Sequence, residues 1–125
     1  MQATILFGHG SSDPAWRIPI DTVARRMRES APQALVRCAF LERTAPDLNT
    51  TVGELVQQGV NQIKIVPMFL GIGRHAREDM PLLVTNLQTV YPQVSFKLNP
   101  SVGEEPLVVD LLARIAMQPF TVSAS

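Results

Sequence analysis

The chain contains two histidines, and each follows an apolar stretch that ends in glycine. His9 stands in "TILFGHGSSD" and His75 in "IVPMFLGIGRH", while Glu42 follows a third apolar stretch in "AFLERTAPD". Two imidazoles and a carboxylate bind a divalent first-row metal ion and leave coordination positions open. Imidazole also takes up and releases protons near neutral pH. We therefore predict that His9, His75 and Glu42 form one site for metal binding and proton transfer.

These three residues can act together only if the fold brings them to one edge. Strand-like and helix-like segments alternate along the sequence, with short connections between them. The expected strands cover residues 3–8, 34–41, 62–70 and 93–98, and the expected helices cover residues 16–29, 47–58, 78–90 and 104–117. The alternation predicts a three-layer α/β fold, in which a four-stranded parallel sheet of order 2-1-3-4 has helices on both faces. Such sheets bind ligands beyond the carboxyl ends of their strands, where all three residues are expected.

Length and composition are typical of one domain, residues 1–125, with a tail from about residue 118. Eleven basic and eleven acidic residues give no net charge, which argues against a nucleic-acid partner. No apolar run approaches the roughly 18 residues of a membrane span, and no signal-peptide pattern is visible at the N-terminus. We therefore expect a cytoplasmic protein with no membrane partner. Cys38 is the only cysteine, which excludes a disulfide framework and a multi-cysteine metal site.

The residues alone leave other interpretations open. The segment "GHGSSD" precedes an expected helix, and glycines and serines at a helix N-terminus bind anions. It lacks the lysine of a Walker loop and the spacing of GxGxxG, yet a phosphate- or nucleotide-binding α/β protein stays an alternative. His9 could also bond to the following helix end, and His75 and Glu42 could be ordinary exposed loop residues.

Three stretches carry a resemblance to a known family: "LFGHGSSDP", "AFLERTAPDL" and "VPMFLGIGRHAREDMP". With the C-terminal "NPSVGEEPLVVDLLARI", they resemble the small form of the sirohydrochlorin chelatases, the CbiX group of class II tetrapyrrole chelatases. The resemblance implies a chelatase-like half-domain. It also implies insertion of a divalent metal ion (cobalt or iron, and nickel in some archaeal forms) into sirohydrochlorin, in cobalamin or sirohaem biosynthesis. No ATP and no cofactor beyond the metal substrate are implied.

The family's metal and proton residues match His9, His75 and Glu42, so the resemblance makes these both the catalytic residues and the metal ligands. A metal or tetrapyrrole carrier without turnover is the alternative. Sirohydrochlorin carries eight carboxylates, and guanidinium groups pair with carboxylates through two hydrogen bonds. The expected substrate-binding residues are Arg74, Arg77, Arg43, Ser11 and Ser12, with Arg17 as a further candidate.

Longer members of this superfamily contain two α/β halves with a cleft between them, whereas this chain has the length of one half. The resemblance therefore implies a homodimer whose cleft lies between subunits. The apolar run "PMFLGI" near the end of the third expected strand is the candidate contact surface.

Overall fold

A computed structural model describes residues 1–121 of the chain, so residues 122–125 of the expected tail lie outside the described part. The elements in chain order are β1 (Gln2–Gly8), η1 (Pro14–Arg17), α1 (Ile18–Ser30), β2 (Leu35–Phe40), α2 (Leu48–Gln57), β3 (Gln62–Pro67), α3 (Arg74–Val90), β4 (Ser95–Leu98), η2 (Val102–Glu104) and α4 (Pro106–Ala116). The four strands are parallel throughout, in the order β2-β1-β3-β4. The expected sheet and its strand order are therefore confirmed.

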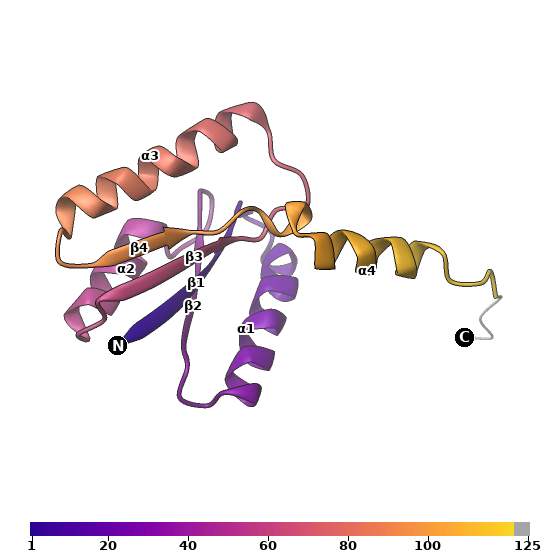
Figure 1. Ribbon diagram of the computed structural model, residues 1–125, viewed down its shortest axis with the longest axis horizontal. Coiled ribbons are helices and arrows are strands. Elements are labelled where there is room, and N and C mark those ends of the chain that lie inside the picture. The colour runs from indigo at the N-terminus through magenta and orange to yellow at the C-terminus, as the bar shows by residue number, and fades with distance from the viewer. Residues whose placement is uncertain (122–125) are drawn as a thin grey trace.

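Helices cover both faces of the sheet, as Figure 1 shows, with α1 on one face and α2 and α3 on the other. Successive side chains of β1 point to opposite faces. Ile5 and Phe7 belong to the core under α2 and α3, whereas Leu6 packs with Ala24 of α1. The predicted three-layer α/β fold is confirmed on this central part of the molecule.

Each helix begins one to four residues from its expected start, and the differences at α1 and α3 have a physical cause. Residues 14–17 form the 3₁₀ turn η1, capped by the Asp13 carboxylate, which accepts a hydrogen bond from Ala15 N at 3.0 Å. The helix expected from residue 16 therefore starts only at Ile18. The helix expected from residue 78 starts a turn earlier, at Arg74, so that Pro81 lies inside it. The start was expected at residue 78 because proline is favoured in the first turn of a helix. Proline is also found inside a helix, at the cost of one backbone hydrogen bond.

The third strand ends at Pro67, inside the apolar run of residues 62–70, where the proline was expected to mark either the strand end or an irregular edge. Proline has no N–H to continue the ladder. Residues 68–73 consequently form a loop, and this loop carries Met68, Phe69 and Leu70 to the carboxyl edge of the sheet.

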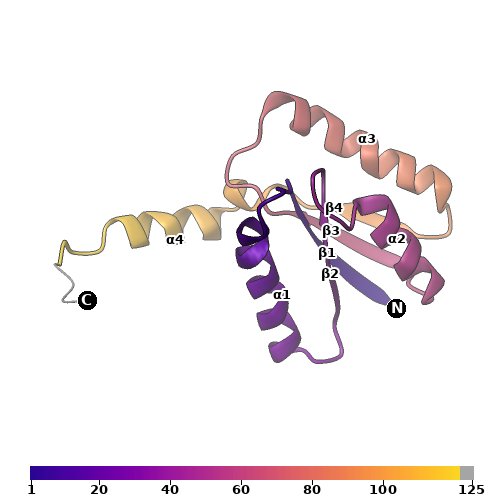
Figure 2. The ribbon, with the colours of Figure 1, turned by 180° about the vertical axis from the view of Figure 1, so that it is seen from behind.

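Helix α4 forms where a helix was expected, but it covers neither face of the sheet. Figures 1 and 2 show it projecting away from the other elements, beginning beside the carboxyl ends of the strands. No residue of α4 is buried, and every residue from Val109 to Thr121 is exposed. The helices that cover the two faces of the sheet are therefore α1, α2 and α3. None of the helices within residues 1–121, α4 included, has both the length and the apolar character that a membrane span requires.

Candidate active site

The loops that follow β1 and β2 lie against each other at the carboxyl edge. The backbone N–H of Leu41 donates to the carbonyl of Gly8 at 2.9 Å, and that of Glu42 donates to the carbonyl of His9 at 3.1 Å. Gly10 has φ +95°, and a Cβ atom there would collide with the carbonyl oxygen of Glu42. Only glycine fits both the backbone conformation and the close approach. This contact places the side chains of His9 and Glu42 at the same point.

Each ring nitrogen of His9 faces an oxygen atom. Its Nδ1 lies 3.3 Å from the carbonyl oxygen of Gly10, and its Nε2 lies 3.7 Å from Oε1 of Glu42. A proton on Nδ1 that is donated to the carbonyl leaves the lone pair on Nε2. When Nε2 then takes up a proton, the Glu42 carboxylate lies beside the new positive charge. Both side chains are more than half exposed, so the pair contributes little to stability and stays open to a ligand.

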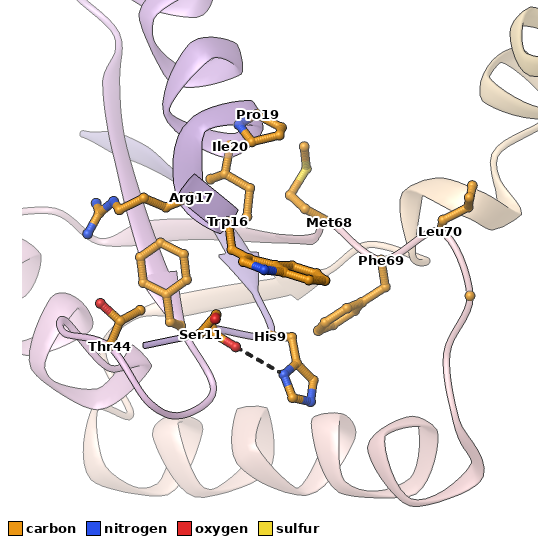
Figure 3. Close-up of a pocket in the computed structure, with 13 residues that line it drawn as sticks. His9, Ser11, Trp16, Arg17, Pro19, Ile20, Thr44, Met68, Phe69 and Leu70 are labelled. Carbon is orange, nitrogen blue, oxygen red and sulfur yellow. Dashed lines mark hydrogen bonds between the residues drawn. The ribbon is translucent and has the colours of Figure 1, made fainter. Parts of the chain in front are cut away.

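A cavity of about 320 Å³ opens at this edge, and the rings of His9, Trp16 and Phe69 lie together in it (Figure 3). The His9 ring meets the Phe69 ring edge to face at 6.4 Å between centroids. Trp16 comes from η1 and Phe69 from the loop after β3, so two separate segments supply the aromatic walls. Ser11 and Thr44 add hydroxyl groups to the lining. The cavity therefore combines a broad apolar wall with few polar groups, as ligand sites generally do.

Arg17 is the arginine that the structure holds most firmly at this cavity. Its Nε donates to the Asp21 carboxylate at 2.8 Å, and its guanidinium carbon lies 4.9 Å from the centre of the Phe40 ring. The hydrogen bond to Asp21 raises the pKa of the Arg17 guanidinium above its ordinary value. The sequence placed Arg17 behind the other candidate arginines, whereas the structure gives it a fixed position on the lining.

The other predicted substrate residues lie around the edge without lining this cavity, except for Ser11. Arg74 is almost fully exposed and pairs with Glu78 at 3.4 Å, and Arg77 pairs with Glu104 of η2 at 3.7 Å. Arg43 lies 3.8 Å from Glu42 and adopts a positive φ of 67°, which is costly for a residue with a side chain. Ser12 is exposed next to Ser11.

His75 lies in the first turn of α3, exposed, on the same edge of the sheet as His9. It does not line the aromatic cavity. Within residues 1–121 no three His, Cys, Asp or Glu side chains are gathered closely enough to hold a metal ion. The structure thus brings His9 and Glu42 together and leaves His75 outside their pair. The shared cavity for both histidines, expected from the sequence, is not formed in the isolated chain.

Trp16 and Phe69 are cavity residues that the sequence did not single out for the ligand site, although Phe69 belongs to the run "PMFLGI" that was the candidate contact surface. Trp16 was counted with the helix from residue 16, and Phe69 with an apolar run at the end of a strand. Each of the two residues lies in a segment that follows a strand, and each of these segments also contains a histidine. That position was the sequence signal that could have identified them. A large exposed aromatic side chain at such a place is unusual without a ligand, and Trp16 is 73% exposed.

The family model described as CbiX matches residues 3–118, which is nearly the whole chain. A sirohydrochlorin cobaltochelatase of Methanococcus aeolicus is 31% identical over 84 residues, covering 67% of this chain and 59% of the relative. The match therefore spans less than two thirds of that relative's length. A CbiX protein from Marinobacter aquaeolei VT8 has a similar structure, with 31% identity and a TM-score of 0.81 over 93% of this chain and 94% of that one.

A two-fold longer protein matches as well. The sirohydrochlorin chelatase SirB from Bacillus subtilis subspecies spizizenii, solved in complex with cobalt, has 25% identity and a TM-score of 0.71. The similarity covers 90% of this chain but 48% of SirB. This chain belongs to the CbiX family.

Proposed function

We propose that this protein inserts a divalent metal ion, cobalt or iron, into sirohydrochlorin without ATP. The observation that carries the proposal is the His9 imidazole, whose Nε2 faces Glu42 at 3.7 Å beside an aromatic cavity. Nickel is a third candidate metal. Membership in the CbiX family and the similarity to relatives named as sirohydrochlorin chelatases support this choice of substrate. The cytoplasmic location expected from the sequence stays a prediction.

Metal insertion requires that a flat macrocycle be held and that two pyrrole protons be removed. Trp16 and Phe69 offer apolar surfaces for the macrocycle, and Arg17 offers a positioned guanidinium for a peripheral carboxylate. The incoming metal ion is attracted by the Glu42 carboxylate and ligated by the neutral His9 Nε2 before it passes to the macrocycle. Once the metal ion has left, His9 Nε2 accepts one of the two displaced pyrrole protons and the Glu42 carboxylate accepts the other. In this proposal His75, Arg74 and Arg77 act from the first turn of α3 on the metal and on the substrate carboxylates.

The proposed active form is a homodimer. The cavity of about 320 Å³ lies at the lower end of ligand-site volumes and holds only part of a tetrapyrrole. SirB, with about twice the length, supports two halves as the complete unit. A second copy facing the carboxyl edge supplies the other wall, and with it a second set of His9, Glu42 and His75.

The direct test is anaerobic incubation with sirohydrochlorin and each metal, followed by the absorbance of the macrocycle. The proposal expects many turnovers per chain with cobalt or iron and no effect of added ATP. A carrier, the alternative function, binds sirohydrochlorin or the metal stoichiometrically and gives a single change that stops at one equivalent. Tight binding of nucleotides without binding of the tetrapyrrole would instead favour the phosphate-binding interpretation of "GHGSSD".

A further inference from the structure

Arg17 is the N-cap residue of α1, a position where an arginine does not stabilise the helix. Within residues 1–121 its side chain makes no capping hydrogen bond, and the side-chain oxygen that an N-cap position favours is missing from arginine. A positive charge at the start of a helix also opposes the helix dipole. The stability of α1 therefore does not explain why arginine occupies this position, and the contacts of its guanidinium group suggest another reason.

The guanidinium group of Arg17 is fixed by Asp21 of α1, Phe40 of β2 and Ala45 of the loop after β2. Nε donates to Oδ2 of Asp21 at 2.8 Å, and Nη2 donates to Oδ1 of the same carboxylate at 3.3 Å. Nη1 donates to the carbonyl oxygen of Ala45 at 3.4 Å, and the guanidinium carbon lies 4.9 Å from the centre of the Phe40 ring. A side chain that is already held in this way loses less conformational freedom when a ligand binds.

The contact between Arg17 and Asp21 differs from an ordinary ion pair on a helix surface. Arg25 and Glu29, with the same spacing on α1, approach to 3.7 Å, and their side chains are 66% and 68% exposed. Such an exposed pair contributes little. The side chains of Arg17 and Asp21 are only 35% and 46% exposed, and they meet through two hydrogen bonds. Asp21 therefore fixes the orientation of the Arg17 guanidinium plane, and the pair of Arg25 and Glu29 provides a matched comparison.

The hydrogen bonds of Arg17 leave part of its guanidinium group free for a ligand. A guanidinium group has five N–H donors. Asp21 accepts from Nε and from one N–H of Nη2, and Ala45 accepts from one N–H of Nη1. Within residues 1–121 this leaves one N–H on each terminal nitrogen without a partner. Two N–H groups of one guanidinium are what a carboxylate accepts in a bidentate pair.

The position of this guanidinium group in the cavity matches the rim of a macrocycle. In Figure 3 the Arg17 side chain points away from the rings of His9 and Trp16, toward the side on which Thr44 lies. Metal insertion takes place at the centre of the macrocycle, which the proposed function sets at His9. The carboxylates of sirohydrochlorin lie on the rim of the macrocycle. One of them can therefore reach Arg17 while the central nitrogen atoms face His9.

We propose that Asp21 is a positioning residue, which holds the Arg17 guanidinium group so that its two remaining N–H groups bind one rim carboxylate of the tetrapyrrole. The proposal rests on the proposed function and names the residue that orients the substrate-binding arginine. Asp21 acts through Arg17 and does not touch the substrate. Because the bound carboxylate is remote from the reacting centre, the contact is equally strong before and during metal insertion. It therefore contributes to substrate binding and leaves the rate of the chemical step unchanged.

Binding of metal-free sirohydrochlorin, followed by the absorbance of the macrocycle, tests the proposal without turnover. Arg17→Gln removes the charged donors and is expected to weaken binding about 10- to 100-fold. Asp21→Asn keeps the shape of the side chain but releases the guanidinium group, so binding should weaken about threefold to tenfold. Arg17→Lys keeps the charge without the planar fork and should lie between wild type and Arg17→Gln. Arg25→Gln and Glu29→Gln are the matched controls and should bind like wild type, and thermal unfolding checks that all variants are folded.

The double variant Arg17→Gln/Asp21→Asn distinguishes positioning from a structural role of Asp21. If Asp21 acts through Arg17, its replacement weakens binding no further once Arg17 is glutamine, whereas independent roles give additive losses. In insertion kinetics both single variants should raise KM and leave kcat within about twofold of wild type. Additive losses, or a lower kcat at unchanged KM, overturn the positioning role.

Two further results separate the subsite from the proposed function. A folded Arg17→Gln or Arg17→Lys protein that binds sirohydrochlorin as tightly as wild type overturns the carboxylate subsite and leaves metal insertion to be judged by its own assay. Wild-type protein that binds no sirohydrochlorin overturns both the subsite and the proposed function.

Discussion

Gly10 lies against the backbone carbonyl of Glu42, so closely that no side chain fits between the two loops. This contact joins the end of β1 to the end of β2 and sets His9 beside the Glu42 carboxylate. Gly59 has nearly the same backbone conformation, φ +92° against +95°, but nothing lies within 4 Å of the position a Cβ would take. Replacing each glycine in turn therefore distinguishes the effect of backbone strain, which both substitutions cause, from the effect of a collision at the site, which only a substitution of Gly10 causes.

We predict that Gly10→Ala lowers both stability and metal insertion, whereas Gly59→Ala lowers stability alone. A left-handed conformation costs a residue with a side chain about 1–2 kcal/mol, and both variants bear this cost. Gly10→Ala additionally pushes the Glu42 loop away from His9. Urea unfolding gives the stability difference, and the initial rate of insertion gives the effect on the site. Equal rates for the two variants would show that the contact between the loops does not matter for function.

His9→Ala is expected to lower the insertion rate by about 100-fold or more, because a positioned proton acceptor contributes at least about that factor. The initial rate of insertion checks this, with thermal unfolding as the control for folding. A folded His9→Ala protein that works at the wild-type rate would assign the proton transfer to another group.

His75→Ala is expected to reduce metal insertion greatly and to leave stability unchanged within about 0.5 kcal/mol, because His75 is exposed in the first turn of α3. Asn86→Ala, an exposed position near the other end of α3, is the control for changes on this helix. Insertion kinetics and thermal unfolding of both variants provide the measurement. Insertion at the wild-type rate would remove His75 from the mechanism and leave His9 and Glu42 as the working pair.

The strands and the edge on which the site lies could be predicted from the sequence, because both depend on local patterns. The apolar runs that contain Ile5, Ala39 and Ile65 became the first three strands, and their order follows from the handedness of parallel connections. Asp47 caps the second helix at the position where that helix was expected to begin. A side chain that follows a strand in such a sheet must lie at the carboxyl edge, which placed His9 and Glu42 correctly.

The distance between His9 and His75 could not be predicted in this way, because it depends on the loop of residues 68–73. Its path follows from Pro67 ending the strand, where the proline was expected to mark the strand end or an irregular edge, and from the helix starting at Arg74, which was not expected. The position of α4 could not be predicted for another reason. Its apolar pattern indicates that the side chains of Leu111 and Ile115 are buried against other apolar side chains. The pattern does not indicate whether those side chains belong to the same chain or to another molecule.

Cys38 is expected to react slowly with thiol reagents at neutral pH. Partial burial under α1 raises the pKa of its thiol from 9.0 to about 11. The thiolate is the reactive form, and two pKa units reduce its fraction by about 100-fold below pH 9. Labelling by iodoacetamide should therefore be about 100-fold slower than in urea-unfolded protein, and its rate should rise with pH up to about 11. Equal rates in folded and unfolded protein would contradict the shielded position of the thiol.

Trp16 gives a signal for tetrapyrrole binding that does not depend on turnover, because it is the only tryptophan in the chain. Its ring lies in the cavity with Phe69 and is largely exposed, so a macrocycle stacked there should quench its fluorescence by energy transfer (Figure 3).

We predict strong quenching by sirohydrochlorin added without metal. Trp16→Ala should weaken binding about tenfold, since an aromatic contact contributes about 0.5–1.5 kcal/mol beyond its buried area. Trp16→Phe retains a ring and should recover most of the affinity when binding is followed by the absorbance of the macrocycle. Val23→Ala is the control, because Val23 lies on α1 and does not line the cavity. Unquenched fluorescence at saturating sirohydrochlorin would mean that the macrocycle binds elsewhere on the edge.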